Sequence, residues 1–197
     1  MLPSTSVMRE KPVKSIAALS VMLLAMAHVL TAQSSATPVP NPIVTTVRQM
    51  EERYSKNLIG AAEEMPADKY GFAPTPDQMT FGHLVVHIAS SNNGLCAAIA
   101  GEQPPSAKLS ESDSKETLTK ALSDSFTYCQ QVLEKTDDSK LGVPAMLFGG
   151  HTSTRGAALV HLAADWADHY SAAAMYLRLN NLVPPSAKKA DNKPSQH

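Results

Sequence analysis

The segment from residue 152 to residue 180 constrains the fold more than any other part of this sequence. It contains no proline and ends before Pro184, so it predicts one continuous helix about 40 Å long. His161, Asp165 and His169 follow one another at intervals of four residues within it. On a helix, this spacing places all three side chains on one face. The segment is therefore both the longest predicted element and the first candidate for a functional site.

Three further segments carry apolar residues at helical spacing, over residues 42–64, 80–100 and 114–136. Connections rich in proline, glycine or polar residues separate them. The aromatic fraction is only 5%, while Ala, Leu and Met are prominent, and this balance favours packed helices over sheets. No segment shows the alternation of a strand. The sequence therefore predicts an all-α fold, a four-helix bundle over residues 42–185.

The predicted helix ends and connections add local expectations. Asn41 precedes a proline and is expected to cap the first helix with its side chain. In the loop after that helix, we expect Tyr70 and Phe72 to tuck under the bundle. The loop 137–151 carries Met146–Phe148, which could cover one end of the core.

The first residues predict an export signal, over residues 1–32. Arg9, Lys11 and Lys14 precede an apolar run at 16–30, and small residues follow that run. The run is shorter than the span of about 20 residues that a bilayer requires. We therefore expect no stable membrane span after cleavage, with an uncleaved N-terminal anchor as the alternative. The location predicted is periplasmic or secreted.

Residues 33–41 predict a linker, and residues 186–197 predict a disordered tail. The formal net charge is -1. The signal and the tail each carry three basic residues and one acidic residue, so the bundle between them has a net charge of about -5. No basic patch or interleaving of basic and aromatic residues occurs, and we expect no nucleic-acid partner.

The two cysteines, Cys96 and Cys129, fall in the middle-to-late parts of the second and third predicted helices. In an antiparallel hairpin, these positions would lie at different heights. A disulfide needs Cα atoms within about 7 Å. The sequence therefore predicts two buried free thiols, although export would place them where a disulfide can form. Their spacing matches no redox or zinc motif.

A metal inside a bundle needs side chains from different helices at one level. His161 and His169 lie about 12 Å apart along their helix, too far to share one ion easily. Asp165 and His169 are one turn apart and could chelate together with one imidazole from the second helix, where His83 and His87 are also one turn apart. The alternative is that these residues are polar groups lining the bundle.

The chain resembles the DinB-like (DinB/YfiT) metalloprotein superfamily over residues 42–186. The resemblance rests on Met65-Pro66 through Pro76, on Phe81-Gly-His83 through His87, and on His169 through Leu177-Arg-Leu-Asn180 to Pro184-Pro185. It implies a four-helix bundle, a homodimer, and a divalent metal held between the second and fourth helices. By position, the implied metal ligands are His87, Asp165 and His169.

Two features depart from the pattern of that family. Asp165 stands where the family usually has histidine, and Tyr170-Ser171-Ala172 replaces an Arg-Gly-Gln-like run. Two imidazoles and a carboxylate suit iron, zinc or nickel, so the metal identity stays open. The departure is also compatible with a degenerate site.

The resemblance implies a metal-dependent thiol transferase or hydrolase with an unidentified small-molecule substrate, and the N-terminal segment predicts that it is exported. The alternatives are a non-catalytic metal-binding bundle and a metal-free bundle that acts as an interaction module. We expect His83 and His161 to flank the metal and Trp166 to pack in the core. Tyr170 is also expected to pack in the bundle. No general base is assigned, and Tyr170 and His161 are the two candidates for that role.

Overall fold

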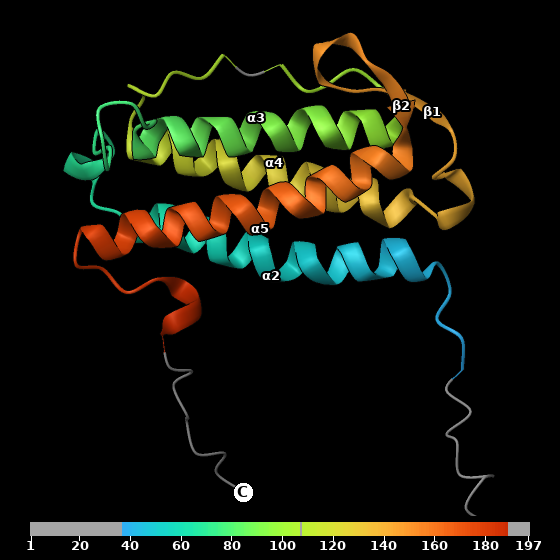
Figure 1. The fold of residues 1–197 in the computed structure, drawn as a ribbon, viewed down its shortest axis with the longest axis horizontal. Helices are drawn as coiled ribbons and strands as arrows, with labels where there is room; N and C mark the ends of the chain where they lie inside the picture. The colour runs from blue at the N-terminus through green and yellow to red at the C-terminus, as the bar shows by residue number, and fades with distance from the viewer. Residues whose placement is uncertain (1–36, 107, 189–197) are drawn as a thin grey trace, which may run out of the picture. The chain divides into compact units, whose positions relative to one another are not determined.

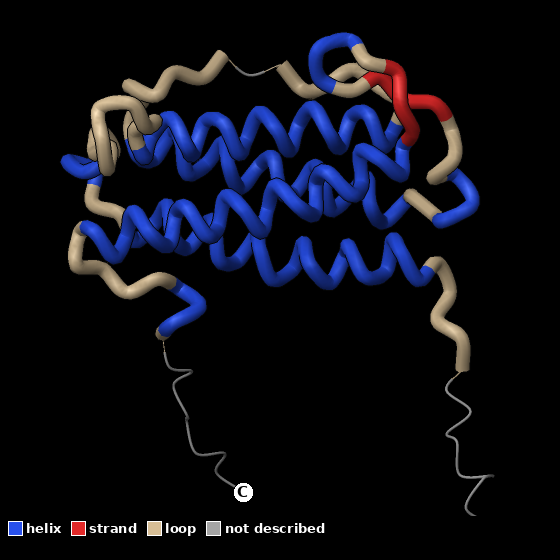
Figure 2. The backbone as a smooth tube through the Cα atoms, in the orientation of Figure 1, coloured by secondary structure: helices blue, strands red, loops and turns tan. Residues whose placement is uncertain are grey.

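Four α-helices make up the bundle in the computed structural model, which describes residues 37–106 and 108–188 (Figure 1). They are α2 (Pro42–Glu64), α3 (Phe81–Ala100), α4 (Lys115–Lys135) and α5 (Arg155–Leu179). Helices account for most of the regular structure (Figure 2), so the all-α four-helix bundle is confirmed. The predicted signal at residues 1–32 lies outside the described residues. None of the described helices is both long and apolar enough to cross a bilayer.

The helices α3 and α4 run in the same direction, and α2 and α5 run the opposite way (Figure 1). The connection from α3 to α4 passes back along the bundle, so α4 begins beside the start of α3. At that point the Thr80 hydroxyl donates a hydrogen bond of 2.7 Å to Glu111. Any residue with a side chain in place of Gly82 would force the backbone near Glu111 to shift, since its Cβ would lie 2.8 Å from the backbone oxygen of Glu111. The close crossing thus depends on glycine.

The start of α2 is capped from a distant part of the chain. Asn41 has a left-handed backbone and makes no capping bond, so the predicted cap was wrong. The carboxylate of Asp138 instead accepts hydrogen bonds from the backbone N–H groups of Ile43, at 3.0 Å, and Val44, at 2.9 Å. The Asn41 side chain accepts a bond from the Asp138 backbone N–H. The cap therefore also holds the loop after α4 against α2.

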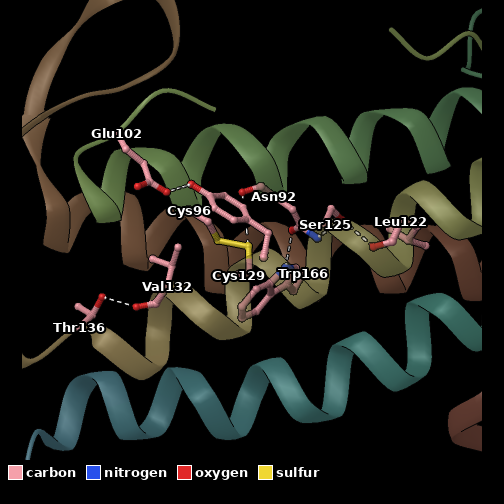
Figure 3. Close-up of a disulfide and its surroundings, with 10 residues drawn as sticks. Asn92, Cys96, Glu102, Leu122, Ser125, Cys129, Val132, Thr136 and Trp166 are labelled. Carbon is pink, nitrogen blue, oxygen red and sulfur yellow. Dashed lines mark hydrogen bonds between the residues drawn. A yellow bond between two sulfur atoms is a disulfide. The ribbon is translucent and has the colours of Figure 1, made fainter. Parts of the chain in front are cut away.

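Cys96 and Cys129 form a disulfide (Figure 3), whereas the sequence predicted two free thiols. Their Cα atoms are 5.3 Å apart, which is within the range that a disulfide spans. The prediction was wrong because it assumed an antiparallel hairpin. Since α3 and α4 are parallel, the two positions reach the same level. Both residues are fully buried, so the disulfide ties α3 to α4 inside the core.

A polar network next to the disulfide joins three helices (Figure 3). The Asn92 side chain on α3 accepts a hydrogen bond of 2.8 Å from the indole N–H of Trp166 on α5. The same side chain donates to the Ser125 hydroxyl on α4 at 3.0 Å, and that hydroxyl donates to the Leu122 carbonyl. Trp166 has no exposed surface, which confirms its predicted packing role. The network fixes the register of α5 against α3.

The proline-rich loop between α2 and α3 closes one end of the core, as predicted. Tyr70 is 5% exposed, and its hydroxyl donates a hydrogen bond of 2.8 Å to the Ala62 carbonyl. Its ring meets Phe81 edge-on, at 5.2 Å between centroids. Phe72 packs edge-on against Tyr176 on α5. The contact between Phe72 and Tyr176 holds the end of α5 that lies beyond His169.

The helix α5 begins at Arg155, three residues later than predicted, because a short strand precedes it. The strands β1 (Pro144–Met146) and β2 (Thr152–Thr154) pair antiparallel. The Thr154 side chain then caps α5 by accepting a hydrogen bond from the Ala157 backbone N–H. The sequence predicted no strand, since elements of three residues leave too short a pattern to detect.

The sequence predicted that the tip of this ribbon, residues 146–148, could cover one end of the core. The structure differs from that prediction. Only Leu147 packs against the core, while Met146 is 69% exposed and Phe148 is 57% exposed. Phe148 lies over α3 at Gly94, where an added Cβ would be 2.8 Å from the ring. The ribbon tip is therefore attached to the outer side of α3.

The chain folds back on the bundle after α5. Residues Pro185–Ala187 form a turn of 3-10 helix, and the Tyr170 hydroxyl donates a hydrogen bond of 2.6 Å to Ser186. The sequence placed a disordered tail at 186–197. Its first residues contact the bundle, and residues 189–197 lie outside the described part of the chain.

Candidate metal centre

The side chains of His87 on α3 and His169 on α5 lie against each other. Their ring centroids are 4.9 Å apart, with an interplanar angle of 85°. The two residues are 82 positions apart in the sequence, and the packing of antiparallel α3 and α5 brings them to one level. The structure thus places two imidazoles, one from each helix, where the sequence predicted a shared site.

His169 is buried, with 8% of its surface exposed. Its Nδ1 atom is inaccessible and has no hydrogen-bond partner within the described residues. Burial lowers the pKa of His169 from its ordinary value, Asp165 opposes this shift, and His87 adds to it. A lowered pKa favours the neutral imidazole, which is the form that binds metals. The chemistry of His169 therefore fits a metal ligand.

Asp165 lies one turn before His169 on α5 and is half-buried. Its carboxylate is close enough to raise the pKa of His169. Across the two described ranges, however, no group of three or more His, Cys, Asp or Glu side chains is arranged as a complete metal site. The three residues match a metal in donor type, and the two imidazoles lie against each other, but together with Asp165 they do not form a complete set of ligands.

The packing of α5 decides which of its residues face α3. Trp166 is fixed by Asn92 in the core, between Asp165 and His169 in the sequence. His169 comes three residues after Trp166, so the helical period places both side chains on the same side of α5. At the far end of α5, the Tyr176 hydroxyl donates a hydrogen bond to the Met79 carbonyl. Two anchors thus hold the helix segment that carries both candidate ligands.

His83 and Tyr170 make their contacts with residues outside the imidazole pair. His83 faces the loop before α4, with its Nδ1 atom 3.5 Å from the Glu111 carboxylate. The Tyr170 hydroxyl is engaged by Ser186, and its ring approaches Tyr54 of α2. Tyr170 is therefore a packing residue, as predicted, and is directed away from the candidate site.

His161 and Asp165 line the same cavity. The cavity has a volume of about 300 Å³, and its lining also includes His151 and Phe148. Sequence reasoning did not select these last two residues. A histidine and an aromatic residue flanking Gly149-Gly150 were the available signal, but only the fold shows that the ribbon tip reaches α5.

The family model of the DinB superfamily matches residues 49–173 of this sequence. The chain belongs to the DinB superfamily. The matched range includes His87, Asp165 and His169, together with most of α2 and α5. The resemblance inferred from the sequence motifs is confirmed.

Solved structures with the DinB fold support the same architecture. A DinB-like protein from Bacillus subtilis is 17% identical, with 74% of this chain and 99% of that chain covered and a TM-score of 0.59. A DinB-like protein from Bacillus cereus is 15% identical, with 71% and 93% covered and a TM-score of 0.59. The mycothiol-dependent maleylpyruvate isomerase is 13% identical, with 65% and 59% covered and a TM-score of 0.53. At these identities the likeness concerns the fold alone.

No curated protein matches this DinB-superfamily chain at a significant level.

Proposed function

We propose that this chain is an exported DinB-superfamily protein that binds one divalent metal ion, zinc, nickel or iron, between α3 and α5. His87, Asp165 and His169 would hold the ion. The observation that carries the proposal is the imidazole pair, whose centroids are 4.9 Å apart. A buried nitrogen without a partner costs free energy, and a metal would satisfy His169 in a way that no described neighbour does.

The donor set also agrees with metal chemistry. Two neutral imidazoles and one carboxylate form a set that iron, zinc and nickel accept, and three protein ligands leave a coordination position open. Asp165 supplies the negative charge that compensates part of the charge of the ion. Cys96 and Cys129 are paired in the disulfide, so neither can compete for the ion as a thiolate. A site made of nitrogen and oxygen donors is therefore compatible with export to an oxidising compartment.

The proposal of export rests on two features. The basic and apolar N-terminal segment predicts a signal, and Cys96 is paired with Cys129. Disulfides persist in oxidising compartments and are rare in a reducing cytosol. Together they support a periplasmic or secreted protein. Homodimerisation, expected from the family, is part of the same proposal.

A metal with an open position would make this protein a thiol-dependent transferase or a hydrolase. A bound divalent ion lowers the pKa of a thiol or water ligand and so supplies a nucleophile at neutral pH. In the protein, His87, Asp165 and His169 would orient that position, and the half-buried Asp165 would face the incoming substrate. The thiol-dependent reaction named for the maleylpyruvate isomerase supports a thiol as co-substrate.

The competing proposal is a bundle that binds no metal and acts as an interaction module. It is favoured by one observation, that the described residues hold no completed group of three ligands. A third alternative is a bundle that binds the metal at the same site but catalyses no reaction.

Elemental analysis of the purified native protein separates these functions. We expect about one zinc, nickel or iron ion per chain, and loss of that ion in His169→Ala. His83→Ala is the matched control, since His83 lies one turn before His87 on α3 but faces Glu111. Equal metal content in all three proteins, or none in the native protein, would reject the proposed site.

Activity is then measured on metal-loaded and metal-free protein. Transfer of dithiothreitol to 1-chloro-2,4-dinitrobenzene tests the transferase, and hydrolysis of p-nitrophenyl acetate tests the hydrolase. Turnover that depends on the metal and is lost in His169→Ala supports an enzyme. Metal binding without turnover of either probe favours the non-catalytic bundle.

A further inference from the structure

Apolar and polar side chains both line the cavity beside Asp165. The apolar residues are Leu95 of α3 and Leu147 and Phe148 of the ribbon tip. The polar residues are His151, His161 and Asp165. A cavity with this mixed lining suits a ligand that has an apolar body and a polar group.

Phe148 is held at this cavity by a specific contact with α3. Its ring lies against Gly94 so closely that a Cβ at that position would be 2.8 Å from the ring. The ring nevertheless remains 57% exposed, because the ribbon tip stands outside the core. A large aromatic side chain that is fixed on one side and open on the other offers a surface for a second ring.

The volume of the cavity is sufficient for a small ring. A cavity of roughly 150 Å³ accommodates benzene, and this one measures about 300 Å³. It therefore has room for one six-membered ring and a short polar substituent.

We propose that this cavity binds the substrate of the protein, and that the substrate is a small aromatic compound carrying an oxygen or sulfur donor. The ring would pack against Phe148, Leu147 and Leu95, and the donor would point to Asp165 and the metal beside it. This inference rests on the proposed function, since Asp165 is shared by the cavity and by the proposed metal ligands. His151 and His161 would lie beside the polar head as hydrogen-bonding groups.

The test uses two hydroxamates with the same metal-binding head. Benzohydroxamate carries a phenyl ring, and acetohydroxamate carries only a methyl group. Both are titrated into cobalt-loaded protein by calorimetry, while the cobalt absorption spectrum reports entry of the head group at the metal. We expect benzohydroxamate to bind at least about tenfold more tightly, because its phenyl ring is transferred from water to the apolar residues of the cavity.

Phe148→Ala should abolish this preference, leaving acetohydroxamate affinity and cobalt content unchanged. Met146→Ala is the matched control. It removes an exposed apolar side chain from the same ribbon, but Met146 does not line this cavity. The fold should tolerate both changes, since both side chains are largely exposed.

The possible failures differ from one another. Equal affinity for both hydroxamates, or a preference that survives in Phe148→Ala, overturns the aromatic cavity while the metal site stands. Native protein that retains no cobalt and binds neither compound overturns the proposed function and this inference with it.

Discussion

The indole N–H of Trp166 donates a hydrogen bond of 2.8 Å to the side-chain oxygen of Asn92 inside the core. Both residues are almost fully buried, and Asn92 also reaches Ser125 on α4. A single amide therefore joins α3, α4 and α5. The candidate ligands on α5 lie next to this bond in the sequence, so their level relative to His87 depends on it.

Asn92→Ala should destabilise the protein by about 2 to 4 kcal/mol. The change leaves the buried Trp166 N–H without its acceptor, removes one of the two hydrogen bonds of the Ser125 hydroxyl, and opens a small void. Urea denaturation measures the free energy of unfolding. Asn93→Ala is the control, because the neighbouring side chain lies outside this network. A loss no larger than that of the control would show that the network contributes little.

The disulfide should be present in protein isolated from an oxidising compartment and should contribute about 3 to 4 kcal/mol. It closes a loop with a sequence separation of 33 residues, and loss of that constraint raises the entropy of the unfolded chain. Thiol titration of the denatured, unreduced protein should find no free thiol. Cys96→Ala with Cys129→Ala should lower the free energy of unfolding. Two titratable thiols in freshly isolated protein would contradict the pairing.

Glu51 should make the protein less stable as the pH rises. Burial raises its pKa from 4.5 to about 7, helped by Glu52 and Glu134, while a hydrogen bond from Ser55 opposes the shift. Between these two values the folded state holds the proton more tightly than the unfolded state, so the free energy of unfolding falls with rising pH. Above a pH of about 7, Glu51 is ionised in the folded state as well, and the free energy of unfolding is lowered by the full cost of burying its charge.

The variant Glu51→Gln removes this titration. Relative to it, the native protein should lose up to about 3 kcal/mol between pH 5 and pH 8. Urea denaturation across that range measures the difference, with Glu52→Gln as the control on the same helix. Parallel stability curves for the native protein and Glu51→Gln would rule out a buried titrating carboxyl group.

Asp138→Ala should destabilise α2 although Asp138 lies far from that helix in the sequence. It removes both acceptors for the first N–H groups of α2, and loss of a helix cap costs about 1 kcal/mol. Urea denaturation gives the magnitude, and Asp138→Asn should retain part of the cap. Asp68→Ala removes an exposed carboxylate elsewhere and serves as the control. Equal effects of Asp138→Ala and Asp68→Ala would refute the cap.

The fold was predictable because helical spacing is a local property. The predicted helices match α2, α3, α4 and most of α5, and the family motifs lie within them. The direction of α4 was not predictable from spacing, since a connection of 14 residues can either turn back or cross over. That one ambiguity led to the wrong prediction for Cys96 and Cys129.

The candidate site was predictable only in part. The interval between Asp165 and His169 follows from one helix, and their approach to His87 follows from the bundle. Contacts between a loop and a distant helix leave no periodic signal. Neither the cap by Asp138 nor the position of Phe148 over Gly94 could therefore be read from the sequence.

X-ray absorption at the zinc edge tests the central claim most directly. The zinc-loaded protein should show nitrogen and oxygen neighbours without sulfur, with scattering from two imidazoles. In His87→Ala, the scattering should fall to one imidazole, while His83→Ala should match the native spectrum. An unchanged spectrum in His87→Ala, or a sulfur neighbour, would contradict a metal held between α3 and α5.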